Sequence, residues 1–153
     1  MAQPASFKIP SSNKRRASLQ EDFRQATSAT LRAMSGNKEL EAVFASNARG
    51  KIGNDVFITS PSREMTPAEQ ALVRGESDQN ALREALHDEK LHTRLAPLEM
   101  TARQGFDAME QVRYEALGAK DMGGVRQNLQ AAHEQRVSDL NLKFVNAKEE
   151  APL

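Results

Sequence analysis

The sequence predicts a mainly α fold: an α+β domain of about five helices with one small β-hairpin. Apolar residues recur at helical spacing over most of the 153 residues, as expected for helices that bury one face. The segment 66–69 has the residue types of a helix start. Between residues 39 and 59 the spacing changes to alternation around turn-forming residues, which is typical of a hairpin. A chain of this length is expected to form one core.

The first 16 residues predict a flexible basic arm, because they contain prolines, serines and the basic triplet 14–16 but few apolar residues. The triplet can contact phosphates or an acidic partner, although a solvated flank is the more frequent role of such a run. The helical domain is then expected over 17–145. Its first helix runs from Ser18 to Met34, and Gly36 is the expected C-terminal stop.

A β-hairpin is predicted near 39–59. Leu40, Ala42 and Phe44 alternate with other residues, 55–59 is rich in β-branched and aromatic residues, and the turn formers of 46–54 lie between them. The alternative is that the segment 38–44 extends a helix.

Three helical stretches follow. Thr66 is the expected N-cap of the first, and a cap of this kind contributes about 1 kcal/mol. Gly75 costs about 1 kcal/mol relative to alanine inside a helix, so it either breaks the helix or permits close packing. A short helix over 88–95 should end before Pro97. The expected buried stripe of the first stretch is Ala68, Ala71, Leu72, Gly75, Leu82, Ala85 and Leu86. Another helix begins near Thr101 and ends at Gly118, with Ala102, Gly105, Phe106, Met109, Val112 and Ala116 as its apolar face.

The last helix is expected from about Gly124, and residues 146–153 should begin a linker or a truncated continuation. Its apolar positions are Val125, Leu129, Ala132, Leu140 and Phe144.

Composition excludes several classes of protein. The chain carries 21 basic and 21 acidic side chains, so its net charge indicates no nucleic-acid partner. It has no cysteine, which removes disulfides and thiolate ligands. No apolar run approaches the roughly 20 residues that cross a bilayer, and the N-terminus lacks the apolar core of a secretion signal. We therefore expect a cytoplasmic location and no membrane partner.

No catalytic residue, metal site or bound cofactor is predicted. The Gly-Lys pair at 50–51 comes closest to a phosphate-binding loop, but it lacks both the first glycine and the hydroxyl residue of that motif. His87 and His92 are five apart, which on a regular helix turns their side chains about 140° from each other. They therefore cannot share one metal ion there, and solvent-facing or capping roles are expected for their neighbours.

Charged side chains of the segment 83–113 are the candidates for contact with a partner. Arg103 with Asp107, and Glu110 with Arg113, have the spacing of surface pairs worth about 0.2–0.5 kcal/mol each. Arginines can bind a partner's acidic groups bidentately, although pairing within the chain is their more frequent role. Tyr114 lies off the predicted apolar stripe, which makes it an interface candidate. The candidate partner-binding residues are Arg83, His87, His92, Arg94, Arg103, Glu110, Arg113 and Tyr114.

Ordered blocks from roughly residue 28 to the end resemble the N-terminal region of CobT, a subunit of the aerobic, ATP-dependent cobaltochelatase of cobalamin biosynthesis. Leu86 and Thr93 depart from the family pattern, which has cysteine and arginine there. Family members usually continue through an acidic linker into a von Willebrand factor A domain, which this sequence does not include. The resembling blocks are 31–36, 39–45, 74–75, 81–83, the phrase His87-Asp88-x-Lys90-x-His92-x-Arg94-Leu95-Ala96-Pro97, and then 102–119, 122–129 and 151–153.

The resemblance implies a subunit that works with the ring-forming AAA+ ATPase CobS, while the large subunit CobN binds corrin and cobalt. That assembly uses ATP, magnesium and cobalt to insert the metal into hydrogenobyrinic acid a,c-diamide. This chain is then expected to be an interaction platform with no activity alone. Whether it forms a homo-oligomer stays open.

Two other functions are compatible with the sequence. One is an adaptor for a MoxR-type AAA+ ATPase outside cobalamin synthesis, in a short relative of viral or divergent origin. The other is a helical nucleic-acid-binding module that uses the basic N-terminal arm, which salt-dependent DNA binding would support.

Overall fold

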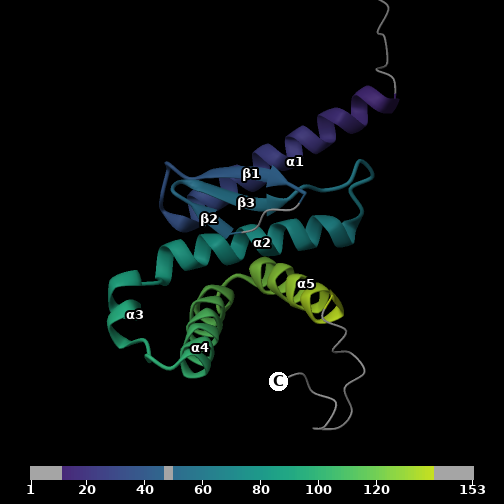
Figure 1. Cartoon of the computed structure of the whole chain (residues 1–153). Helices are drawn as coiled ribbons and strands as arrows, with labels where there is room; N and C mark the ends of the chain where they lie inside the picture. Colours follow the sequence, from purple (N-terminus) through teal and green to yellow (C-terminus); the bar gives the residue numbers. More distant parts are fainter. Residues whose placement is uncertain (1–11, 47–49, 140–153) are drawn as a thin grey trace, which may run out of the picture.

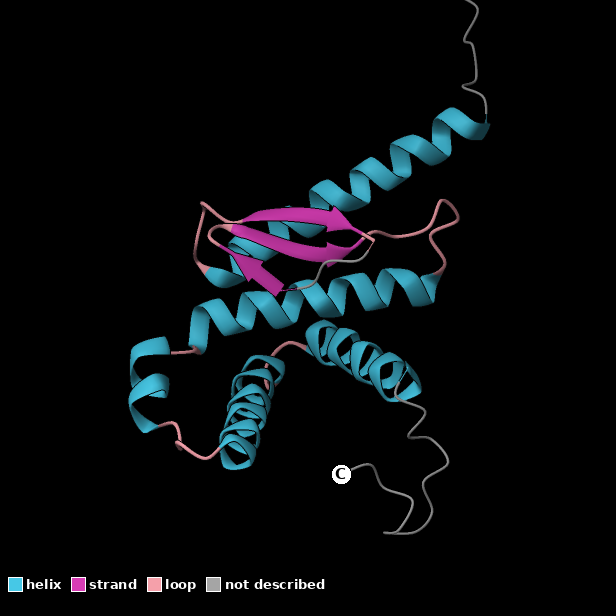
Figure 2. Ribbon diagram, in the orientation of Figure 1, coloured by secondary structure: helices cyan, strands magenta, loops and turns pink. Residues whose placement is uncertain are grey.

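The computed structural model describes residues 12–46 and 50–139. Its sheet and α1 lie on one side of α2, and α4 and α5 lie on the other (Figure 1, Figure 2). The predicted fold class, mainly α with a small β part, is confirmed. In chain order the elements are α1 (Ser12–Ser35), β1 (Glu41–Ala45), β2 (Gly50–Ile52), β3 (Asp55–Thr59), α2 (Pro67–Leu86), α3 (Glu89–Leu95), α4 (Met100–Ala119) and α5 (Gly123–Asp139).

Helix α1 begins at Ser12, six residues before the predicted start. The end of the predicted basic arm is thus helical, and residues 1–11 lie outside the described residues. Lysine and arginine have good helix propensity, so the basic triplet 14–16 extends the helix toward the N-terminus, beyond the apolar pattern that begins at Ser18. Gly36 has a φ of +69° directly after the helix, which confirms the predicted stop.

The sheet has three strands in the order β1-β3-β2, so the hairpin was predicted between the wrong strands. The antiparallel hairpin joins β2 to β3 through two residues, since Ile52 pairs with Asp55. The first loop residue, Gly53, has a φ of +61°, as tight hairpin loops require. β2 therefore occupies one edge of β3, and β1 pairs with the other edge in parallel. We expected residues 46–54 to be only a connection, whereas they contain β2.

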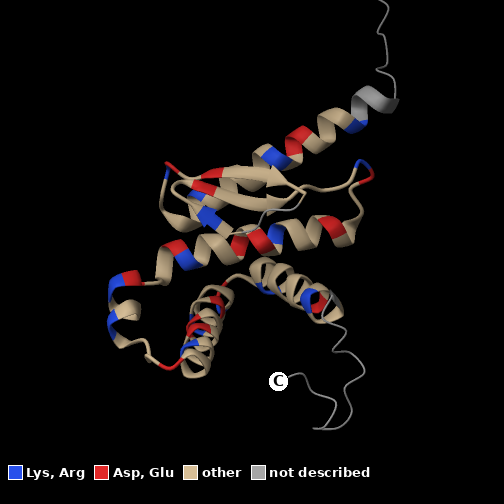
Figure 3. Ribbon diagram, viewed as in Figure 1, with Lys and Arg blue, Asp and Glu red and all other residues tan. Residues whose placement is uncertain are grey.

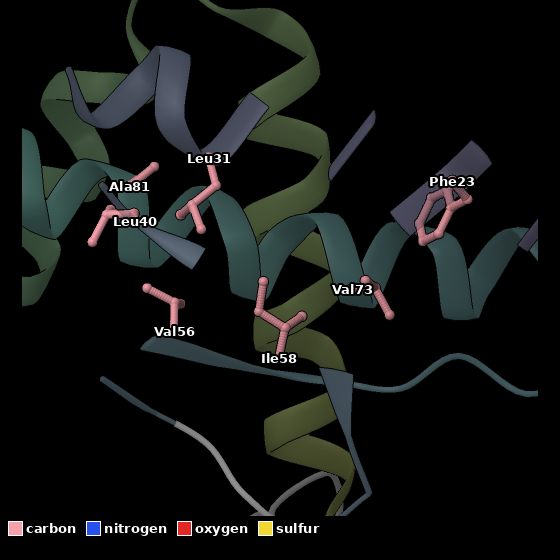
Figure 4. Close-up of a cluster of buried hydrophobic side chains, with 7 residues drawn as sticks. All are labelled: Phe23, Leu31, Leu40, Val56, Ile58, Val73 and Ala81. Carbon is pink, nitrogen blue, oxygen red and sulfur yellow. The ribbon is translucent and has the colours of Figure 1, made fainter. Parts of the chain in front are cut away.

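The first hydrophobic cluster lies between the sheet, α1 and α2 (Figure 4). The central strand β3 points Val56 and Ile58 into it, and both are fully buried. Because one face of this small sheet packs on two helices, the strands gain the cover that an isolated ribbon lacks. The cluster consists of Phe23, Leu31, Leu40, Val56, Ile58, Val73 and Ala81.

Helix α2 begins with the predicted capping box: the Thr66 hydroxyl accepts from the Glu69 amide, and the Glu69 carboxylate accepts from the Thr66 amide. The prediction of one buried stripe is wrong, since Ala68, Ala85 and Leu86 are exposed. α2 buries two adjacent faces, because it has neighbours on both sides. Its buried residues are Val73, Gly75, Ser77, Asp78, Ala81 and Leu82.

The second face of α2 packs on α5 and α4. A Cβ at Gly75 would lie 2.3 Å from the carbonyl oxygen of Asn128 in α5, so the glycine permits close packing and does not break the helix. Three residues further along, Asp78 accepts a hydrogen bond of 2.8 Å from Asn128. The second hydrophobic cluster consists of Leu82, Tyr114, Val125 and Leu129.

The face that α4 buries differs from the predicted one. Met109 and Val112 are 74% and 63% exposed, whereas Tyr114 and Glu115 are buried. Gly118 is the second-to-last residue of α4, one residue before the end of the helix, and it lies against Leu82 of α2. Because Gly118 has no side chain, the face of α4 that carries Tyr114 can pack closely on α2. Met109 and Val112 of the predicted apolar stripe are therefore left exposed to solvent.

Helices α3 and α5 agree with expectation where they are described. Asp88 caps α3 by accepting from the Leu91 amide at 2.9 Å, and the helix ends before Pro97. In α5 the predicted positions Val125, Leu129 and Ala132 are buried. The predictions for Leu140, Phe144 and the segment 146–153 lie outside the described residues.

We predict that Gly75→Ala destabilises the protein by about 1–3 kcal/mol, because the new methyl group overlaps the α5 backbone. The gain in helix propensity of about 1 kcal/mol does not offset a clash with backbone atoms, which move only with the helix. Urea unfolding followed by circular dichroism measures the change.

Gly105→Ala is the matched control, since this glycine also lies inside a helix but has open space around its would-be Cβ. It should be neutral or stabilise by up to about 1 kcal/mol. Equal stability of the two variants would contradict the close packing of α2 on α5.

Candidate partner-binding site

The candidate site lies where α2 ends and the chain turns through α3 into α4. His87 ends α2, with its amide donating to the Arg83 carbonyl at 3.0 Å. The segment 87–92 is therefore not one regular helix, and the two histidine rings meet edge to face with centroids 4.8 Å apart. The predicted 140° separation is wrong because the helix breaks between the histidines.

His87 and Glu110 connect the end of α2 to α4. The His87 side chain is 7% exposed, and its Nδ1 lies 2.8 Å from Glu110 Oε1. Arg113 binds the same carboxylate bidentately at 2.6 and 2.7 Å, which confirms the predicted Glu110–Arg113 pair. Arg113 also donates to the Leu86 carbonyl at 2.6 Å and so satisfies an acceptor that the end of α2 leaves open.

The Arg113 guanidinium, with a smaller contribution from His87, lowers the pKa of Glu110 from its usual 4.5 to about 2, although burial acts in the opposite direction. The carboxylate in turn raises the pKa of Arg113. Glu110 therefore stays charged far into the acid range, and its charge is part of the structure of this junction.

His92 attaches α3 to α4. Its Nε2 lies 2.7 Å from Asp107 Oδ1, and its ring stacks on Phe106 with centroids 4.6 Å apart. Asp107 was predicted to pair with Arg103, but its carboxylate faces His92. Since α3 buries none of its residues, these side-chain contacts hold the short helix in place.

A polar hollow of about 280 Å³ opens at this junction. Six of the eight predicted partner-binding residues line it: Arg83, His87, His92, Arg103, Glu110 and Tyr114.

The remaining two candidates lie outside the lining. Arg113 stands behind Glu110 as its ion-pair partner, and Arg94 is exposed on α3 away from the hollow. Tyr114 is only 6% exposed and belongs to the second cluster, where burial raises its pKa. It was an interface candidate because it lies off the predicted apolar stripe, and the structure buries it because α4 turns this residue toward α2.

Arg83 is an accessible cation of this site. Its side chain is 57% exposed and has one long contact, 3.4 Å, to Glu89. Two further hollows, of about 400 and 260 Å³, adjoin the first, and Arg83 lines all three. Basic and acidic residues both occur along α2, α3 and α4 (Figure 3).

Sequence reasoning missed the part of this surface that the sheet supplies. Lys51 of β2 forms an ion pair with Glu84 of α2, which also accepts from Asn37 at 2.9 Å. Both contacts lower the pKa of Glu84, with Lys51 as the larger cause. Because these partners are 33 and 47 residues from Glu84, no local pattern predicts them.

The arrangement is suited to recognition of a charged partner. Within residues 12–46 and 50–139, no group of three or more histidine or acidic side chains is arranged to hold a metal ion. No helix of that same part of the chain is long and apolar enough to cross a membrane. The site offers an exposed guanidinium beside carboxylates that are already paired.

We predict that Arg113→Ala raises the pKa of Glu110 from about 2 toward 4.5, because it removes the main cause of the shift. NMR titration of the carboxyl carbon measures this value. Arg103→Ala is the control, since that arginine has no part in the shift, and it should leave the pKa near 2. Equal values in both variants would contradict the ion pair.

The same shift predicts how stability depends on pH. A carboxyl with a lowered folded pKa stabilises the fold above its unfolded pKa, and this contribution is lost as the pH falls through the folded value. The free energy of unfolding should thus differ most between the wild type and Glu110→Gln above pH 4.5 and converge near pH 2. Urea titrations across this range measure the difference, and a gap that persists at pH 2 would contradict the account.

Comparison with known proteins agrees with the sequence resemblance. The family model of cobalamin biosynthesis protein CobT matches residues 17–153, which include all of the sheet, α2 and the candidate site. No solved structure gives a significant match. The chain belongs to the CobT family of cobalamin biosynthesis proteins.

Proposed function

We propose that this chain is a non-catalytic part of the ATP-dependent cobaltochelatase that inserts cobalt into hydrogenobyrinic acid a,c-diamide, where it serves as an interaction platform for the AAA+ subunit CobS. Membership of the CobT family supports a role in cobalamin biosynthesis. In this proposal the large subunit CobN is the second partner, and ATP, magnesium and cobalt are bound by the other subunits. The cytoplasm remains the predicted location.

The gathering of the candidate residues around Arg83 is the observation that supports a platform most directly. Six residues spread over 83–114 line one hollow, and among them the Arg83 guanidinium is open to solvent. An exposed arginine at the meeting point of three hollows can bind a partner's carboxylate in a bidentate manner.

The neighbouring charges have a different role in this proposal. Glu110 and Arg113 bind each other, and His87 is buried against Glu110. These groups hold the end of α2 against α4 and so position Arg83. We therefore assign partner contact to Arg83 and support of the surface to the residues beneath it.

We predict that Arg83→Ala weakens binding of the chain to CobS about tenfold, which corresponds to about 1.4 kcal/mol, because an anionic group of the partner loses its cation. Pull-down and titration of purified CobS, with and without ATP, measure the loss. Circular dichroism establishes that the variant is folded.

Arg94→Ala is the matched control, because Arg94 is an exposed arginine on the adjacent helix α3 but lies outside the three hollows. It should change binding less than twofold. Unchanged binding by both variants would place the contact on another face. ATP hydrolysis or cobalt insertion by this chain alone would contradict the non-catalytic assignment.

A further inference from the structure

An apolar groove of about 640 Å³ runs between α4 and α5, on residues that the partner-binding hollow does not use. The two helices meet at the connection 120–122 and diverge from it (Figure 1). Val112 of α4 is 63% exposed and Val137 of α5 is 40% exposed, and both line the groove. Met109, 74% exposed, extends the apolar surface along α4.

The charges along the groove favour one arrangement of an occupant. Arg126, Gln130 and Glu134 line it from α5 at intervals of four residues, so they share one stripe of the helix. The stripe is basic near the start of α5, where Arg126 also donates to the carbonyls of Ala119 and Lys120, and acidic near its end, where Glu134 also accepts from Gln130. A second α5 that packed in parallel would oppose like charges, whereas an antiparallel one would oppose unlike charges.

An antiparallel copy of α5 makes this stripe complementary to itself. With a twofold axis beside Gln130, position 126 of each copy faces position 134 of the other, which gives two identical ion pairs. Val137 then faces Gly123 of the other copy, where the space around the glycine is open. One twofold axis thus pairs Arg126 with Glu134 and also places the exposed Val137 side chain over Gly123, which has no side chain.

We propose that the α4–α5 groove is a self-association surface, in which two copies of the chain pack their α5 helices antiparallel around a twofold axis beside Gln130. Such an interface is isologous, since the same patch on each copy faces the other. Each α5 occupies the groove of its partner copy and covers Val112 and Ala116 of that copy's α4. The surface is separate from the Arg83 site, so the dimer can form with or without the AAA+ partner.

Charge exchange tests the pairing of positions 126 and 134. Sedimentation velocity of the full chain should show a dimer, and Arg126→Glu or Glu134→Arg alone should shift it to monomer. A mixture of the two single variants should restore a dimer, because one copy then carries only glutamates and the other only arginines at these positions. The double variant should also dimerise, since it reverses both charges of each pair.

The absence of cysteine permits a second test of the axis. Gln130→Cys places one thiol on each copy beside the axis, so a short bifunctional maleimide should link the two copies efficiently. Lys90→Cys, on exposed α3, is the control and should give only background linkage. The melting temperature of each variant shows that loss of the dimer is not loss of the fold.

A wild-type chain that is monomeric at all concentrations overturns the proposal and leaves the groove to residues 140–153 or to a different protein. The proposed axis is overturned if Arg126→Glu and Glu134→Arg each remain dimeric. It is also overturned if Gln130→Cys and Lys90→Cys give equal yields of cross-linked dimer. The groove variants keep Arg83, so they should bind CobS as the wild type does. Failure of the dimer and failure of the proposed function are therefore separate results.

Discussion

The rest of the structure depends on the burial of α2 on two adjacent faces. Val73 and Ala81 belong to the cluster shared with α1 and the sheet, while Leu82 belongs to the cluster shared with α4 and α5. Outside α2, Met34 of α1 also packs against both clusters. The C-terminal helices can pack on the second face of α2 because two glycines permit close approach. Gly75 lies against the α5 backbone, and Gly118 of α4 lies against Leu82. Two small residues thus determine how near the C-terminal helices come to α2.

The position of the candidate site follows from where α2 stops. The helix ends at His87, and Arg113 of α4 satisfies the carbonyl of Leu86. The ion pair of Glu110 with Arg113 and the contact of Glu110 with His87 hold this end by charge as well as by packing. Glu110 contacts both Arg113 and His87 at this junction, and Arg83 beside them remains exposed. A surface of this kind presents an accessible cation on a base of paired side chains, which suits recognition of an acidic group.

Local signals predicted the features that local physics determines. The capping box at Thr66 and the stop at Gly36 depend on neighbours a few residues away, and both are confirmed. The helical period of α5 also predicted its buried positions Val125, Leu129 and Ala132. The α4 face and the strand pairing depend on distant partners. Tyr114 faces α2 because Gly118 allows the approach, and no spacing within α4 indicates this. β1 pairs in parallel with β3, and the hairpin partner of β3 is β2, whose three residues lie in a run of turn-forming residues. The candidate residues of the site were chosen from the sequence by their chemistry and by the resembling block 87–97. The contact of His87 with His92 could not be predicted, because it depends on the break in the helix between them.

Native-state hydrogen exchange tests most directly whether α2 joins the two clusters into one cooperative unit. If it does, the amides of the buried part of α2, residues 73–82, exchange slowest and only through global unfolding. Buried amides of α1 and α5 should then approach the same opening free energy as denaturant is added. The account would be contradicted if α4 and α5 opened together at a much lower free energy while α1, α2 and the sheet stayed protected, because the two halves would then fold as separate units.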